Sequence, residues 1–182
     1  MTVPNALTLI RLFLSPVVFL FVAFGWYWAS SIIYLLGILT DALDGKLART
    51  TQTTSAFGGA MDSTADKTLV AGGMIGLTAQ GELPASFIFA FVFREFVVFG
   101  LRAIRTTDGS TVAGINDRLG RIRFFVLHLG VILLLTPSWK ASLRLTGLWT
   151  IGIALILAYM ALLFYIKRDF HILRATLKHH AS

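Results

Sequence analysis

The sequence contains no cysteine and is poor in charged residues of either sign. The missing thiols exclude disulfide bonds and cysteine-ligated metal sites. Charged residues make up 14% of the chain, against about 25% in soluble globular domains. Hydrophobic residues make up 56% of it, and the mean hydropathy is +0.77. This balance is typical of a membrane protein rather than a soluble domain.

Long apolar segments of helical length follow one another, with short polar stretches between them. The first has 19 residues without a charge, enough to span a bilayer as a helix. Before it, residues 2–10 predict a short interfacial helix, with Arg11 facing the lipid headgroups. We therefore expect an all-α integral membrane protein: one domain over residues 1–182, a six-transmembrane-helix bundle with a short N-terminal interfacial helix. The expected spans are 12–30, 31–50, 57–79, 85–104, 119–135 and 146–166, followed by a basic tail.

The basic residues are distributed unevenly between the two sides of this predicted bundle. The net charge is +7, and 12 of the 16 lysines and arginines fall on the side of Arg11, with only Lys140 and Arg144 opposite. The positive-inside rule then predicts that both chain ends face the cytoplasm, as in a bacterial inner-membrane protein. Nucleic-acid binding is not expected, because the basic residues are dispersed between apolar helices.

Four of the nine acidic residues lie close together in the sequence, between positions 41 and 66. Asp41 and Asp44 are three residues apart and Asp62 and Asp66 four apart, so each pair shares one face of a helix. The 17 residues between the pairs allow two antiparallel helices that bring all four carboxylates together. Clustered carboxylates repel one another unless they bind cations. Their oxygens suit Mg²⁺, Mn²⁺ or Ca²⁺.

Glycine and arginine accompany these carboxylates. Gly45 and Gly58 would let a bulky ligand approach the backbone, and Arg49 could pair with a phosphate. Together they indicate a metal–diphosphate site. The alternative is that the carboxylates are membrane-edge charges or internal ion pairs.

Charged residues also interrupt the fourth apolar segment, at Arg94 and Glu95. They form either an internal ion pair or a polar pocket for a second substrate. Arg102, Arg121 and Arg123 would complete a basic patch there, or would contact lipid headgroups. His128, inside the fifth segment, is expected to be a hydrogen-bonded packing residue rather than a metal ligand.

Residues 41–66 match the pattern D-x2-D-G-x2-A-R-x8-G-x3-D-x3-D at all eight fixed positions. In this the chain resembles the CDP-alcohol phosphotransferases, integral membrane enzymes that displace CMP from a CDP-linked alcohol. The resemblance implies bound Mg²⁺ (or Mn²⁺) and Asp66 as the base that takes the acceptor proton. The implied metal ligands are Asp41, Asp44, Asp62 and Asp66. The implied CDP-binding residues are Asp41, Asp44, Gly45, Ala48, Arg49, Gly58 and Asp62.

Motifs outside this pattern are similar to those of phosphatidylglycerophosphate synthases within the family. They are Pro4-Asn5 with Leu7-Thr8 and Arg11, Arg94-Glu95-Phe96 with Gly100-Leu101-Arg102, and Gly120-Arg121-Ile122-Arg123. The similarity implies CDP-diacylglycerol and glycerol 3-phosphate as substrates, with the acceptor phosphate bound by Arg94, Arg102, Arg121 and Arg123. One departure is Ser63, where those synthases usually have proline. Inositol phosphate and phosphatidylglycerol therefore stay open as acceptors, and a small cation transporter is the alternative outside the class.

Small residues recur at Gly72 and Gly76, four positions apart in the third segment. Such a pair lets helix backbones approach closely, either within one bundle or between two chains. Members of the resembled family are commonly homodimers, so we expect a homodimer with this stripe at its interface.

Overall fold

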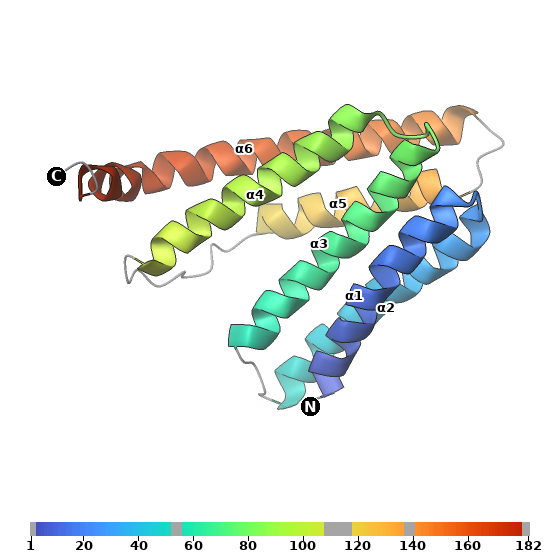
Figure 1. Ribbon diagram of the computed structural model, residues 1–182, viewed down its shortest axis with the longest axis horizontal. Coiled ribbons are helices and arrows are strands. Elements are labelled where there is room, and N and C mark those ends of the chain that lie inside the picture. The colour runs from blue at the N-terminus through green and yellow to red at the C-terminus, as the bar shows by residue number, and fades with distance from the viewer. Residues whose placement is uncertain (1–2, 52–55, 108–117, 137–140, 180–182) are drawn as a thin grey trace.

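Six α-helices, with no strands, make up the described part of the chain in the computed structural model (Figure 1). The structure describes the backbone of residues 3–51, 56–107, 118–136 and 141–179. It describes the side chains of residues 6, 8–41, 58–103, 120–136 and 142–167. The helices are α1 (Val3–Ala23), α2 (Tyr27–Thr51), α3 (Ala56–Ala79), α4 (Ala85–Thr107), α5 (Arg118–Leu135) and α6 (Ala141–His179). The predicted all-α class is therefore confirmed.

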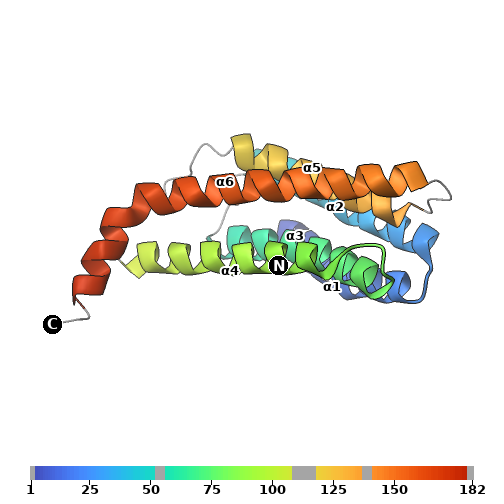
Figure 2. The same ribbon diagram turned by 90° about the horizontal axis from the view of Figure 1, so that it is seen from above.

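The helices lie in two layers. Seen from above, α1, α3 and α4 form one layer and α2, α5 and α6 form the other (Figure 2). The most extensive contacts join α1 to α3, α5 to α6, and α1 to α2. The apolar core lies between the layers and includes Val18, Leu69, Met74, Val131 and Ile151.

The first helix differs from the prediction at both ends. It begins at Val3 and is continuous through residue 11, so the separate interfacial helix expected over residues 2–10 is wrong. It ends at Ala23 rather than Ser30, because Gly25 adopts a left-handed conformation with φ of 75°. The N–H groups of Gly25 and Trp26 donate to the carbonyls of Val22 and Phe21 and close the helix end. Gly25, which lies inside the uncharged segment 12–30, was the feature of the sequence that could have predicted this helix end.

Only one helix in the described part of the chain is long and apolar enough to cross a bilayer by length and composition. It is the stretch Ser142–Lys167 of α6, with a mean hydropathy of 2.2. Thr8–Ala23 is apolar but shorter. The prediction of six spans is therefore not confirmed by this criterion, since α2, α3 and α4 carry charges within their length. The helix α6 continues to His179, so a large part of the expected basic tail is helical.

The small residues of α3 pack within the chain. A Cβ built on Gly72 would lie 2.6 Å from the carbonyl oxygen of Ser15, and one on Gly76 would lie 2.7 Å from the Cβ of Val22. Both neighbours belong to α1. The expectation that this stripe forms a dimer interface is therefore wrong, because the stripe is already covered by α1.

We expect Gly72→Ala and Gly76→Ala to destabilise the bundle, each by roughly 1–3 kcal/mol, because the added methyl group overpacks the α1–α3 contact. Gly100→Ala on α4 is the matched control, since a Cβ there has nothing within 4 Å. It should keep or raise the melting temperature, because alanine is the better helix former. Thermal unfolding in detergent measures all three. Equal melting temperatures for the α3 variants and the control would contradict this packing.

Candidate active site

Three of the four predicted metal-site carboxylates come together at one point. Asp41 lies in the C-terminal half of α2, and Asp62 and Asp66 lie one turn apart in the first half of α3. Each offers an oxygen, and these oxygens lie within 4.8 Å of one another. We call these three residues the acidic triad. Asp44 lies on α2, but its side chain is outside the described residues, so its role as a ligand stays a prediction.

The triad fits a hard divalent cation in the chemistry of its donors. All three are carboxylates, the preferred ligands of Mg²⁺ and Mn²⁺. They come from two different helices, which fixes their spacing by the packing of the bundle. Burial is partial, with Asp66 the least exposed at 20%. Water and a substrate phosphate could therefore complete a coordination shell.

Arg11 of α1 is the unexpected member of this site. Its side chain is wholly buried, and its Nη1 lies 3.1, 2.9 and 2.6 Å from Oδ1 of Asp41, Asp62 and Asp66, respectively. The expectation that Arg11 faces lipid headgroups is therefore wrong. Because α1 packs against both α2 and α3, this residue faces the helices that carry the carboxylates. Three opposite charges compensate the desolvation of one guanidinium group.

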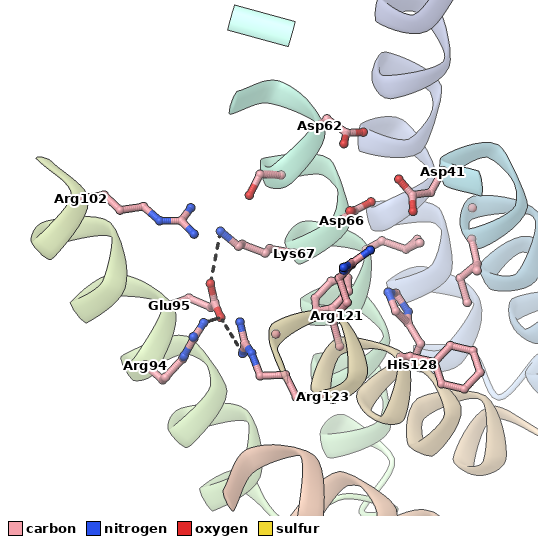
Figure 3. A pocket seen from close by; sticks show the side chains of 17 residues that line it. Asp41, Asp62, Asp66, Lys67, Arg94, Glu95, Arg102, Arg121, Arg123 and His128 are labelled. Carbon is pink, nitrogen blue, oxygen red and sulfur yellow. Dashed lines mark hydrogen bonds and ion pairs between the residues drawn. The ribbon is translucent and has the colours of Figure 1, made fainter. Parts of the chain in front are cut away.

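A pocket of about 460 Å³ adjoins the triad. Its lining brings together residues of α2, α3, α4 and α5 (Figure 3). All three triad residues lie on one side of the pocket. The pocket also has five cationic side chains, which we call the basic cluster: Lys67, Arg94, Arg102, Arg121 and Arg123. Four of them lie on the other side, around Glu95, and Arg121 is drawn closer to the triad (Figure 3). The four arginines predicted to bind the acceptor phosphate thus share one pocket with the triad.

Glu95 organises part of this cluster. Its Oε1 accepts a hydrogen bond from Nη1 of Arg94 and lies 3.9 Å from Nη1 of Arg123. Its Oε2 lies 3.3 Å from Nζ of Lys67 (Figure 3). One carboxylate therefore faces three cations, which leaves the cluster with a net positive charge. The ion-pair alternative for Arg94 and Glu95 is therefore confirmed, and both residues line the pocket. Binding of a second substrate there stays a prediction.

Lys67 was not assigned to the site from the sequence. It follows Asp66 directly on α3, and this offset turns it toward α4 rather than toward the triad (Figure 3). The available signal was a lysine in a predicted membrane segment, where a charged side chain requires a partner. Arg94 also lies within an apolar segment and is buried, with 3% of its side chain exposed. Its Nε has no hydrogen-bond partner among the described residues.

His128 of α5 also lines the pocket. Its Nδ1 lies 2.8 Å from the hydroxyl oxygen of Tyr34 on α2, and its ring meets Phe124 edge-on at 4.6 Å between ring centroids. The prediction of a hydrogen-bonded packing histidine is confirmed. Tyr34 is fully buried, so this bond ties α2 to α5 beneath the pocket.

The predicted CDP-binding residues are only partly described. Asp41 and Asp62 line the pocket, and Gly58 lies in the first turn of α3. Gly45, Ala48 and Arg49 lie on the last turns of α2, and their surroundings fall outside the described residues. Their contact with a nucleotide stays a prediction.

Comparison with known proteins shows to which protein family the chain belongs. The sequence model of the CDP-alcohol phosphatidyltransferase family matches residues 1–168. The chain belongs to this family of enzymes.

Individual proteins of known class are also similar to this chain, in sequence or in fold. The CDP-diacylglycerol–glycerol-3-phosphate 3-phosphatidyltransferase of Bacillus subtilis is 31% identical over 147 residues, 72% of this chain and 75% of that protein. A probable phosphatidylglycerophosphate synthase of Mycobacterium tuberculosis is 30% identical over 173 residues, 90% of this chain and 79% of the relative. The crystal structure of the phosphatidylinositol phosphate synthase of Mycobacterium tuberculosis shares the fold. It has a TM-score of 0.61 and 20% identity, over 91% of this chain and 89% of that one.

Proposed function

We propose that the chain transfers the phosphatidyl group of CDP-diacylglycerol to glycerol 3-phosphate and releases CMP, in phospholipid biosynthesis. The observation that supports this most directly is the charge arrangement of the pocket. Carboxylates suited to a metal–diphosphate face a basic cluster suited to a second phosphate across one cavity. The names of the relatives at 31% and 30% identity point to the same reaction.

The acidic side of the pocket would bind the activated donor. Asp41 and Asp62, with Asp44 from the sequence pattern, would hold Mg²⁺ (or Mn²⁺). The metal ion, when bound, neutralises the diphosphate and stabilises the departing CMP. The cytidine diphosphate would lie along Gly45, Ala48, Arg49 and Gly58.

Asp66 is proposed as the general base, and it would also lie within reach of a second metal ion. Its carboxylate takes the proton of the acceptor hydroxyl as that oxygen attacks the phosphorus attached to diacylglycerol. The bond from this phosphorus to the bridging oxygen breaks, and CMP leaves with that oxygen. The position of Asp66 on the pocket wall, one turn below Asp62, is consistent with this role.

The basic cluster would bind the phosphate of the acceptor. Arginine presents a planar fork that matches a phosphate group. Arg94 and Arg123 are the least exposed of the cluster, at 3% and 14%, so their contacts with an anion are screened least by water. Arg102 and Arg121 are exposed at the pocket mouth and would attract the anion from solution.

We expect Arg94→Ala and Arg123→Ala each to raise the KM for glycerol 3-phosphate by roughly tenfold or more, because each would remove a charge-assisted hydrogen bond. The KM for CDP-diacylglycerol should change far less. Steady-state kinetics with each substrate varied in turn provide the measurement. The control is Arg144→Ala, at the opposite end of the bundle, where Arg144 pairs with Glu82. Equal rises in both KM values would argue against an acceptor-phosphate role.

The bundle is proposed to lie in the bacterial inner membrane with its pocket facing the cytoplasm. The stretch Ser142–Lys167 is long enough to span. Phe89, Phe93, Phe96 and Phe99 of α4 are 49–72% exposed, a surface suited to lipid. The basic cluster lies at the end of the bundle that the positive-inside rule assigns to the cytoplasm.

Inositol phosphate is the second candidate acceptor. Ser63 lines the pocket next to Asp62, at the position where phosphatidylglycerophosphate synthases usually have proline. A serine hydroxyl can hydrogen-bond an additional acceptor hydroxyl group, which a proline cannot.

One experiment tests these assignments. The purified chain is assayed in detergent with CDP-diacylglycerol and Mg²⁺, and CMP release and lipid product are scored for four acceptors: glycerol 3-phosphate, inositol phosphate, phosphatidylglycerol and glycerol. We expect glycerol 3-phosphate to give the highest rate. A higher rate with another acceptor would reassign the substrate. No CMP release with any acceptor would refute the transferase and favour a transporter.

A homodimer is proposed on the family resemblance, through a surface other than the glycine stripe of α3. All eight fixed positions of the sequence pattern lie within residues 41–66 of one chain, so each protomer would contain its own active site. Light scattering in mild detergent would test the assembly, and a fully active monomer would refute it.

A further inference from the structure

The contact of Arg11 with all three triad carboxylates has a consequence for metal binding. One guanidinium nitrogen contacts an oxygen of each of the three carboxylates that together could hold a divalent ion. A metal ion bound to these oxygens and the guanidinium group would place two cations on one set of ligands. They repel each other, and the repulsion is strong where water is largely excluded.

We infer that Arg11 and the divalent cation are alternative partners of the acidic triad. In the metal-free protein Arg11 holds the three carboxylates together, and the metal must displace these contacts when it binds. The inference rests on the proposed metal site but not on the identity of either substrate. Arg11 is in this sense a positioning residue, which acts through the triad rather than on the reacting atoms.

The burial of Arg11 supports the interpretation that it is a structural partner of the triad rather than part of an incidental surface ion pair. Its side chain has no exposed area, and it reaches the triad from the middle of α1. Removing it would leave three carboxylates close together without their cation. Such a cluster becomes stable only when another cation binds. The affinity of the triad for metal should therefore rise when Arg11 is neutralised.

The test measures Mn²⁺ binding to the purified chain in detergent, without substrates, by titration calorimetry. We expect Arg11→Gln to tighten the apparent Kd by about tenfold or more, the factor that corresponds to losing one competing charge-assisted hydrogen bond. Arg94→Gln is the matched control, because Arg94 is also buried but contacts Glu95 instead of the triad. Its Kd should stay within about twofold of the wild-type value.

Thermal unfolding provides a second readout. In EDTA, Arg11→Gln should melt below the wild-type protein, and added Mg²⁺ should raise its melting temperature by more than it raises that of the wild type. Arg11→Lys keeps a positive charge and should lie between the two in both measurements. This variant also tests the inference if Arg11→Gln does not fold.

Mn²⁺ affinity that is unchanged or weaker in Arg11→Gln would overturn the inference, and so would Arg11→Lys binding Mn²⁺ no more tightly than the wild type. Absence of Mn²⁺ binding by every variant would overturn it as well. The outcome is separate from that of the proposed function. Tighter metal binding without transfer to any acceptor would leave the inference standing and refute the transferase, and normal transfer with unchanged metal affinity would do the reverse.

Discussion

Asp66→Asn is expected to lower turnover by ~10²–10⁴-fold, the usual loss when a general base is removed. The amide has the size of the carboxylate but cannot take the proton of the acceptor hydroxyl. Binding of CDP-diacylglycerol should be largely retained, because the base acts on the acceptor. CMP release at saturating substrate measures the first effect, and equilibrium binding of CDP-diacylglycerol measures the second.

Glu82→Gln is the control for this variant. Glu82 is also a carboxylate, but it pairs with Arg144 near the start of α6 and lies outside the pocket. Its turnover should stay near the wild-type value. Near-normal turnover in Asp66→Asn would exclude the base role. Loss of nucleotide binding would instead make Asp66 a ligand of the metal–diphosphate.

Asp41→Asn and Asp62→Asn are expected to lower activity at low Mg²⁺ by roughly tenfold or more, with partial recovery at high Mg²⁺. An amide oxygen is a weaker ligand than a carboxylate for a hard cation, so the affinity for the metal should fall more than the maximal rate of the reaction. The same outcome is expected for Asp44→Asn, which is assigned from the sequence pattern. Activity measured across a Mg²⁺ titration distinguishes a loss of affinity from a loss of maximal rate.

Thr64→Ala is the control on α3. Thr64 is exposed, lies between Asp62 and Asp66 in the chain, and donates its hydroxyl to the carbonyl of Ala60. Its Mg²⁺ dependence should match that of the wild type. Full activity of all three asparagine variants at low Mg²⁺ would refute the metal assignment.

The sequence determined the helical class and the composition of the acidic site, because both depend on local spacing. A carboxylate three or four residues from another shares its helix face whatever the rest of the chain does. Two such pairs on consecutive helices therefore predicted the meeting of Asp41 with Asp62 and Asp66. The sequence likewise predicted a basic patch, from the charges of Arg94, Arg102, Arg121 and Arg123.

The partners of isolated charged and small residues were decided by tertiary packing alone. Arg11 stands by itself in an apolar stretch, and only the packing of α1 against α2 and α3 places it among three carboxylates. Gly72 and Gly76 permit close approach of any helix, and the structure places α1 there. Lys67 and Glu95 come from different helices, so only the fold shows that they meet. Local periodicity specifies which face a residue occupies, and long-range packing specifies what that face contacts.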